Sequence, residues 1–121
     1  MRATTRARSA CCAAALASLR VLERESLIEH AATVGARALE HARKRLANTG
    51  SVREVRGLGL MLGIECDTSD TALAACRRAL ERGYILLPSG EGGRVLSLTP
   101  PLCMGATPLI EAIDAIAELL A

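Results

Sequence analysis

Apolar residues recur at two different periods along this chain. Residues 10–24 and 26–46 carry them at every third or fourth position, which is the spacing of helices that bury one side. The first segment is rich in alanine, with Cys12, Leu16 and Leu19 along one side. In the second segment the apolar stripe comprises Leu27, Ala31, Ala38, Ala42 and Leu46.

The start and the end of the second helix carry recognisable signals. Ser26 and Glu29 match the capping box, in which the serine oxygen accepts a hydrogen bond from a free amide and the glutamate reaches back to the cap amide. Residues 43–45 are all basic and lie in the last turn, where cations favour the negative end of the helix dipole. We expect residues 48–50 to end the helix.

After the second helix, the apolar residues recur at every second position instead of every third or fourth. In residues 57–65 (GLGLMLGIE) Leu58, Leu60, Leu62 and Ile64 alternate with glycine and methionine, which predicts a single strand with one aliphatic face. The other face consists of glycines and one methionine and so has few side-chain atoms, as occurs where another backbone or a ligand comes close.

The second half of the chain alternates between both periods. Helical spacing returns in residues 69–82 through Leu73, Cys76 and Leu80, followed by strands at 84–87 and 95–99 around a glycine-rich turn at 89–93. A final helix is expected with Thr107 as its cap and Pro108 at its first position. Its apolar stripe is Leu109, Ile113, Ile116 and Leu120.

This order of elements predicts an α+β fold: a small antiparallel or mixed sheet of three to four strands covered by helices, preceded by a long broken helix. The alanine-rich first helix has more apolar surface than such a module needs. We therefore expect it to pack on something outside this chain.

Composition limits the kind of core and the classes of partner that the chain can have. The chain of 121 residues fits one domain, and its core must be aliphatic because it has no Phe, no Trp and a single Tyr. The net charge of +2 comes from interspersed charges, which indicates no nucleic-acid partner. No segment reaches the roughly 18 apolar residues of a membrane span, so we expect a soluble, cytoplasmic protein with no membrane partner.

No constellation of residues forms a complete active site. Five scattered cysteines without C-x-x-C spacing, together with two histidines, make a zinc site improbable. Lys44, the only lysine, lies in a basic run at a helix end, which indicates a solvated head group rather than a nucleophile. His30 and His41 are expected to be exposed helix residues. The turn at 89–93 is either a hairpin-type loop, which we favour, or an anion nest.

Four stretches, in order, resemble the C-terminal small domain of class III pyridoxal-phosphate-dependent aminotransferases. Residues 10–25 (ACCAAALASLRVLERE) are similar to the helix that leaves the large domain of that family. Residues 52–65 (VREVRGLGLMLGIE) resemble the V-R-G-x-G-L-M-x-G-I-E segment. Residues 82–102 (RGYILLPSGEGGRVLSLTPPL) resemble two strands with their turn, and residues 108–120 resemble the closing helix.

The resemblance implies a domain layout and a function. Residues 10–121 correspond to the small domain, and residues 1–9 to a disordered or remnant segment. Family members use pyridoxal 5'-phosphate to transfer an amino group between an amine or amino acid and a keto acid or aldehyde. Their catalytic lysine and most cofactor contacts precede this region, so we expect a fragment that is inactive alone and binds no cofactor stably.

The resemblance also marks two site residues and the partners. Thr4 matches the threonine of the family's T-F-x-G-N-P segment, which contacts the cofactor phosphate of a neighbouring subunit, although the Phe, Gly, Asn and Pro are missing here. Ser97 stands where many relatives carry a substrate-binding arginine. The expected partner is the missing large domain or a second copy through helix 10–24. The alternative function is a free-standing, non-catalytic α+β binding or assembly module.

Overall fold

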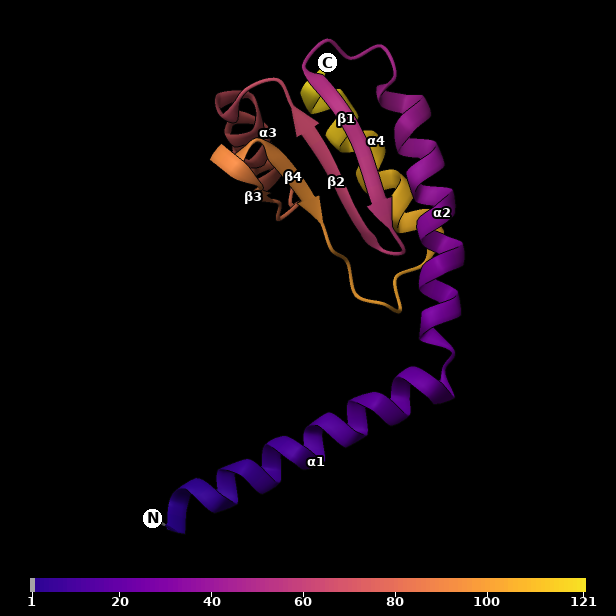
Figure 1. Ribbon diagram of the computed structural model, residues 1–121. Coiled ribbons are helices and arrows are strands. Elements are labelled where there is room, and N and C mark those ends of the chain that lie inside the picture. Colours follow the sequence, from indigo (N-terminus) through magenta and orange to yellow (C-terminus); the bar gives the residue numbers. More distant parts are fainter. Residues whose placement is uncertain (1) are drawn as a thin grey trace.

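Two N-terminal helices meet at a sharp bend. The structure, a computed structural model, describes residues 2–121 of the chain and the side chains of residues 8–121. Helix α1 (Arg2–Arg24) projects away from the remaining elements, whereas α2 (Leu27–Leu46) packs alongside the sheet (Figure 1). The predicted long broken helix is confirmed, but it begins at Arg2 rather than at residue 10.

The predicted capping box at the start of α2 is wrong. Ser26 has φ 48° and ψ 42°, and its side chain makes no cap hydrogen bond. An N-cap serine needs an extended backbone to aim its oxygen at the helix amides, whereas Ser26 takes the left-handed conformation that turns the chain out of α1. The backbone carbonyl of Ser26 accepts from the amide of His30, at 3.0 Å, so α2 still starts where the pattern predicts.

The sheet is antiparallel and has four strands in the order β1-β2-β4-β3. Its strands are β1 (Val52–Leu58), β2 (Met61–Cys66), β3 (Leu87–Ser89) and β4 (Val95–Leu98). A short 3-10 helix, η1 (Glu91–Gly93), forms in the predicted glycine-rich turn between β3 and β4. The predicted fold class is therefore confirmed, with strand β3 lying slightly later than residues 84–87.

The single strand predicted for residues 57–65 is wrong, because a hairpin turn divides it. Leu58 pairs with Met61 across a two-residue turn in which Gly59 has φ +55°. A tight hairpin of this kind needs a positive φ at its first central residue, and glycine supplies it. The turn reverses the chain, so Leu58 lies on the exposed side at 87% exposure while Leu62 and Ile64 are buried.

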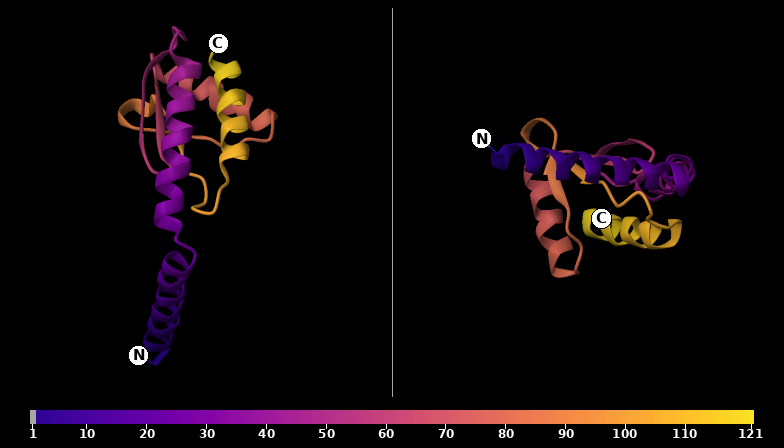
Figure 2. Two further views of the ribbon diagram at one scale, coloured as in Figure 1. Left: turned by 90° about the vertical axis from the view of Figure 1, so that its right-hand side faces the viewer. Right: turned by 90° about the horizontal axis from the view of Figure 1, so that it is seen from below.

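Helices cover one face of the sheet. Figures 1 and 2 show α3 (Ser69–Glu81) and α4 (Ala106–Leu120) behind the sheet and α2 beside β1. The buried centre is aliphatic, as predicted. Its largest fully buried side chains are Ile64, Leu96, Ile113, Ile116 and Cys66.

Two details of the covering helices differ from the expectation. In α3 the alanines 72, 75 and 79 are buried together with Cys76, whereas Leu73 and Leu80 are exposed, because small side chains allow a helix to approach its neighbours closely. Helix α4 begins after Gly105, and Thr107 lies inside its first turn rather than at the cap. None of the helices among the described residues is long and apolar enough to cross a membrane.

Candidate functional site

The face of the sheet opposite the helices carries the candidate site residue Ser97. Side chains alternate along β4, so that Leu96 and Leu98 are buried in the core while Val95 and Ser97 point to the other face. Ser97 pairs with Gly63 of β2 on one side and with Leu87 of β3 on the other. The strand prediction for Ser97 is therefore confirmed, and its part in substrate binding stays a prediction.

A hydroxyl pair forms beside this position. The Oγ atoms of Ser89 and Ser97 lie 2.6 Å apart, and the Ser89 hydroxyl also donates to the carbonyl oxygen of Val95 at 3.3 Å. A serine cannot supply the forked guanidinium that binds a carboxylate at two points. Arg94, the nearest arginine in sequence, lies before β4 at the end of η1 and lines a polar hollow with Asp67 and Glu91.

Arg56, on the same face of the hairpin as Ser97, is already paired. Arg56 Nη1 donates to Glu54 at 2.6 Å and to Glu65 at 2.7 Å. The Arg56 guanidinium holds the pKa of the Glu65 carboxyl below its ordinary value, mainly through that hydrogen bond. Two carboxylates offset this cation, so the cluster offers little net positive charge to an anionic ligand.

Both histidines join elements, contrary to the expectation that they are simply exposed. His41 Nε2 donates to Asp114 Oδ1 at 2.8 Å and so joins α2 to α4, while Arg45 Nε donates to the same oxygen at 3.2 Å. His30 Nε2 donates to the carbonyl of Met104 at 2.8 Å. Periodicity could not predict these pairs, because the two partners of each lie more than seventy positions apart in the chain.

Metal and nucleophile sites are not evident in the described part of the chain. No group of three or more His, Cys, Asp or Glu side chains among residues 8–121 could hold a metal ion. All five cysteines are free, with Cys66 and Cys76 buried. Burial raises the pKa of the Cys66 thiol to about 11, so it stays protonated and unreactive at neutral pH.

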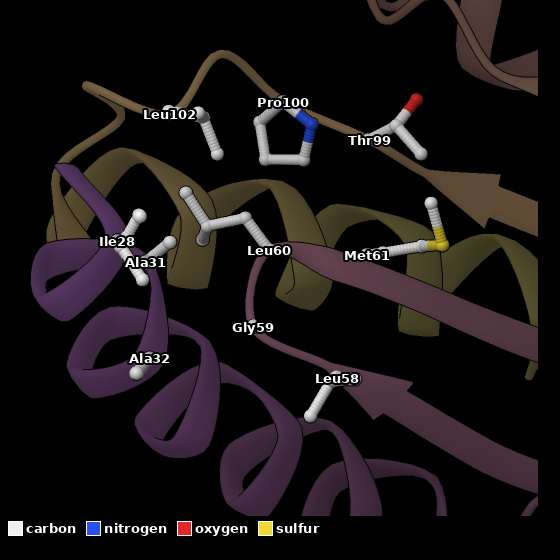
Figure 3. A pocket seen from close by; sticks show the side chains of 10 residues that line it. All are labelled: Ile28, Ala31, Ala32, Leu58, Gly59, Leu60, Met61, Thr99, Pro100 and Leu102. Atoms are coloured by element: carbon white, nitrogen blue, oxygen red, sulfur yellow. The ribbon is translucent and has the colours of Figure 1, made fainter. Parts of the chain in front are cut away.

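An apolar pocket of about 470 Å³ opens at the end of the β1–β2 hairpin, a feature that the sequence did not predict (Figure 3). It forms where the start of α2, the hairpin turn and the loop after β4 meet. Its lining includes Ile28, Leu58, Met61, Pro100 and Leu102, contributed by these three segments. Ile28, Leu58 and Met61 are each more than two-thirds exposed, so this end of the molecule presents apolar side chains to solvent.

An α+β domain of this topology, with one face of its sheet left uncovered by helices, has counterparts among known proteins. The chain matches the class III aminotransferase family over residues 3–120, and it belongs to that family. It is 40% identical to an ornithine aminotransferase of Bordetella pertussis over 91% of this chain and 26% of that protein. It is 34% identical to an acetylornithine aminotransferase of Methanothermobacter thermautotrophicus over 90% of this chain and 27% of that protein.

Solved structures agree with the sequence relatives. The acetylornithine aminotransferase from Elizabethkingia anophelis matches with a TM-score of 0.81 at 31% identity, over 90% of this chain and 27% of that chain. The ornithine aminotransferase from Plasmodium yoelii matches with a TM-score of 0.78 at 33% identity, over 84% of this chain and 27% of that chain. This chain thus spans about a quarter of the length of the relatives it matches.

Lys44, the lysine of the described residues, does not fit the part that a lysine plays in binding the family cofactor, pyridoxal phosphate. A lysine that forms a Schiff base must lose its proton at neutral pH, which requires burial or a neighbouring cation. The side chain of Lys44 is 76% exposed, and its Nζ donates to Glu40 at 2.6 Å, an arrangement that favours the charged amine. The side chain of Thr4, the residue predicted to contact a phosphate, lies outside the described residues.

Proposed function

We propose that this chain serves as the small domain of a class III pyridoxal-phosphate-dependent transaminase whose catalytic lysine lies in a separate large domain. The observation that supports the proposal is that a chain with a family match along its length has no lysine placed for the reaction. The family match extends over residues 3–120, yet the only lysine is exposed and ion-paired. The reaction is amino-group transfer between an amine or amino acid and a keto acid or aldehyde.

The uncovered sheet face is the surface that we assign to the transaminase cleft. It combines the hydroxyl pair of Ser89 and Ser97 with the exposed side chains of Met61 and Leu87. In this proposal Ser97 faces the substrate without the forked contact of an arginine. Thr4 is proposed to reach the cofactor phosphate of a neighbouring subunit.

Two further parts of the proposal concern location and the alternative function. All five cysteines are free thiols, which fits the reducing cytoplasm, and we propose that the protein works there. A free-standing binding module is not favoured, because the match to aminotransferases extends along nearly the entire chain.

Reconstitution tests this function. The purified chain is mixed with the separately expressed large domain of a class III aminotransferase, and amino transfer is measured with ornithine and acetylornithine, the substrates named in its relatives. We expect activity in the mixture and none with either part alone. Lys44→Ala should leave the activity of the mixture unchanged, because Lys44 has no chemical part in it. A stable complex of two folded parts without activity would contradict the proposal.

A further inference from the structure

A second apolar pocket, of about 310 Å³, lies at the end of the sheet where β3 begins. It forms between residues 84–87, the end of β4 and helix α4, and its volume is in the range of small-ligand sites. Its lining includes Leu87, Leu98, Pro100 and Leu109, and no charged side chain of the described residues lines it. Such a lining favours an uncharged aliphatic group, because a charge would lose its hydration there without gaining a partner.

The Ser97 hydroxyl supplies this pocket with a hydrogen-bond acceptor. Ser97 lines the pocket, and its Oγ lies 2.6 Å from Ser89 Oγ. Ser89 donates its proton to the carbonyl oxygen of Val95 at 3.3 Å, so the Ser97 proton is donated to Ser89. The Ser97 oxygen can then accept from a hydroxyl or N–H group, whereas a carboxylate, which only accepts, finds no donor at this atom.

Arg56 and Arg94 leave the pocket without a cation. Arg56 lies two strands from Ser97, across Gly63, and its guanidinium is bound to two carboxylates. Arg94 lies at the end of η1 and lines the polar hollow instead. A carboxylate bound at Ser97 would therefore remain without a counter-charge.

We propose that this pocket takes the non-reacting end of the substrate, and that this end is an uncharged aliphatic group with a hydrogen-bond donor, such as a primary alcohol, rather than a carboxylate. Leu87 and Ser97 belong both to the pocket and to the sheet face assigned to the transaminase cleft, which supports a substrate as the occupant. That assignment rests on the proposed function, whereas the preference for uncharged over anionic ligands is a property of this chain alone.

Binding to the full chain tests the pocket without a large domain. Tyr84 lines the pocket and is the only tyrosine of a chain without tryptophan, so its fluorescence reports occupancy. Titration with hexanol should give a saturable change, and hexanoate should bind roughly tenfold more weakly or worse. Ser97→Ala should weaken hexanol binding several-fold, because it removes the acceptor. No saturable change with hexanol, or equal affinity for hexanoate, would overturn the proposal.

Two matched substitutions establish where hexanol binds. Ala112 lines the pocket, and Ala112→Leu should abolish the fluorescence change by filling the cavity. Ala74→Leu makes the same change at an exposed position of α3 and should leave the response intact. Circular dichroism establishes that each variant is folded. A response that survives in folded Ala112→Leu would also overturn the proposal.

Turnover separates this inference from the proposed function. The mixture with a large domain is given ω-aminopentanol and ω-aminopentanoate, which differ only in a hydroxyl or carboxylate end. We expect kcat/KM to be roughly tenfold higher or more for the amino alcohol, and Ser97→Arg to reverse the preference, because a guanidinium binds a carboxylate at two points. Equal use of both donors would overturn the inference. Inactivity with both donors, while hexanol still binds selectively, would contradict the proposed function and not the preference of the pocket.

Discussion

Two glycines bring α2 and the β1–β2 turn into backbone contact. A Cβ atom added at Gly35 would lie 1.9 Å from the carbonyl oxygen of Gly59, closer than any real contact allows. Gly35→Ala must therefore move the helix away from the hairpin, and we expect it to lower the free energy of unfolding by about 2–4 kcal/mol.

Gly50→Ala is the control for this substitution. A Cβ atom at Gly50 has no neighbour within 4 Å, so its effect on the free energy of unfolding should stay within about 0.5 kcal/mol. Urea denaturation of both variants measures the difference. Equal midpoints would show that the contact between α2 and the turn is absent in solution.

Ser26 offers a prediction of the opposite sign. It is the one non-glycine residue with positive φ in residues 2–121, and that conformation costs an L-residue roughly 1 kcal/mol. Ser26→Gly should raise the free energy of unfolding by about 0.5–1 kcal/mol, because glycine adopts this conformation without strain. Ser26→Ala should change it little, since the serine side chain makes no cap hydrogen bond. A clear loss of stability in Ser26→Ala would show that the Ser26 side chain does cap α2, contrary to the structure.

At the scale of elements, Asp114 connects α4 to α2 by accepting from His41 and Arg45. The hydrogen bond from His41 is the main reason that the pKa of Asp114 lies below its ordinary value. Because the lowered value belongs to the folded state, the stabilisation is present above the ordinary pKa of about 4 and is lost as the pH falls through the lowered value.

Asp114→Asn tests this connection. The variant should be less stable than wild type near neutral pH, and the difference should shrink as the pH falls below about 4. Urea denaturation at a series of pH values measures it. The side chain of Asp114 is 40% exposed, so solvent screening keeps the effect small. A difference that stays constant across the acid range would exclude the ionised carboxylate as its cause.

Packing of α4 gives a larger effect. Ile113 is fully buried between the helices and the sheet, and Ile113→Ala should lower the free energy of unfolding by about 2–5 kcal/mol through lost contacts and the cavity left behind. Leu80→Ala removes an exposed side chain and should cost less than about 0.5 kcal/mol. Similar losses in the two variants would contradict the burial of α4.

The accuracy of the sequence prediction also varies by element. Helices α2 and α4 followed from the period of their apolar residues, and Ile113 and Ile116 are buried as that period predicts. The β1–β2 hairpin was not predicted, because the alternation of leucines with small residues continues through Gly59 and gives no signal of a turn. In α3 the buried alanines are less hydrophobic than the exposed leucines, so the prediction was wrong for Leu73 and Leu80, whereas Cys76 is buried as predicted.

For the whole molecule, the family was predictable and most of the site geometry was not. Family motifs span the chain and place Ser97 in a strand, which the structure confirms. The hydroxyl pair of Ser89 and Ser97 depends on the alignment of β3 with β4, and the apolar pocket at the hairpin end depends on three segments meeting. Neither arrangement leaves a periodic signal in the sequence.

Our central proposal is that this chain serves as the small domain of a transaminase whose catalytic lysine lies in a separate large domain. The most direct test incubates the purified chain with pyridoxal phosphate, reduces it with borohydride, maps the labelled peptides and measures amino transfer in parallel. Because Lys44 is exposed and ion-paired, we predict at most substoichiometric labelling and no turnover. Stoichiometric labelling of Lys44, together with turnover that Lys44→Ala abolishes, would contradict the account.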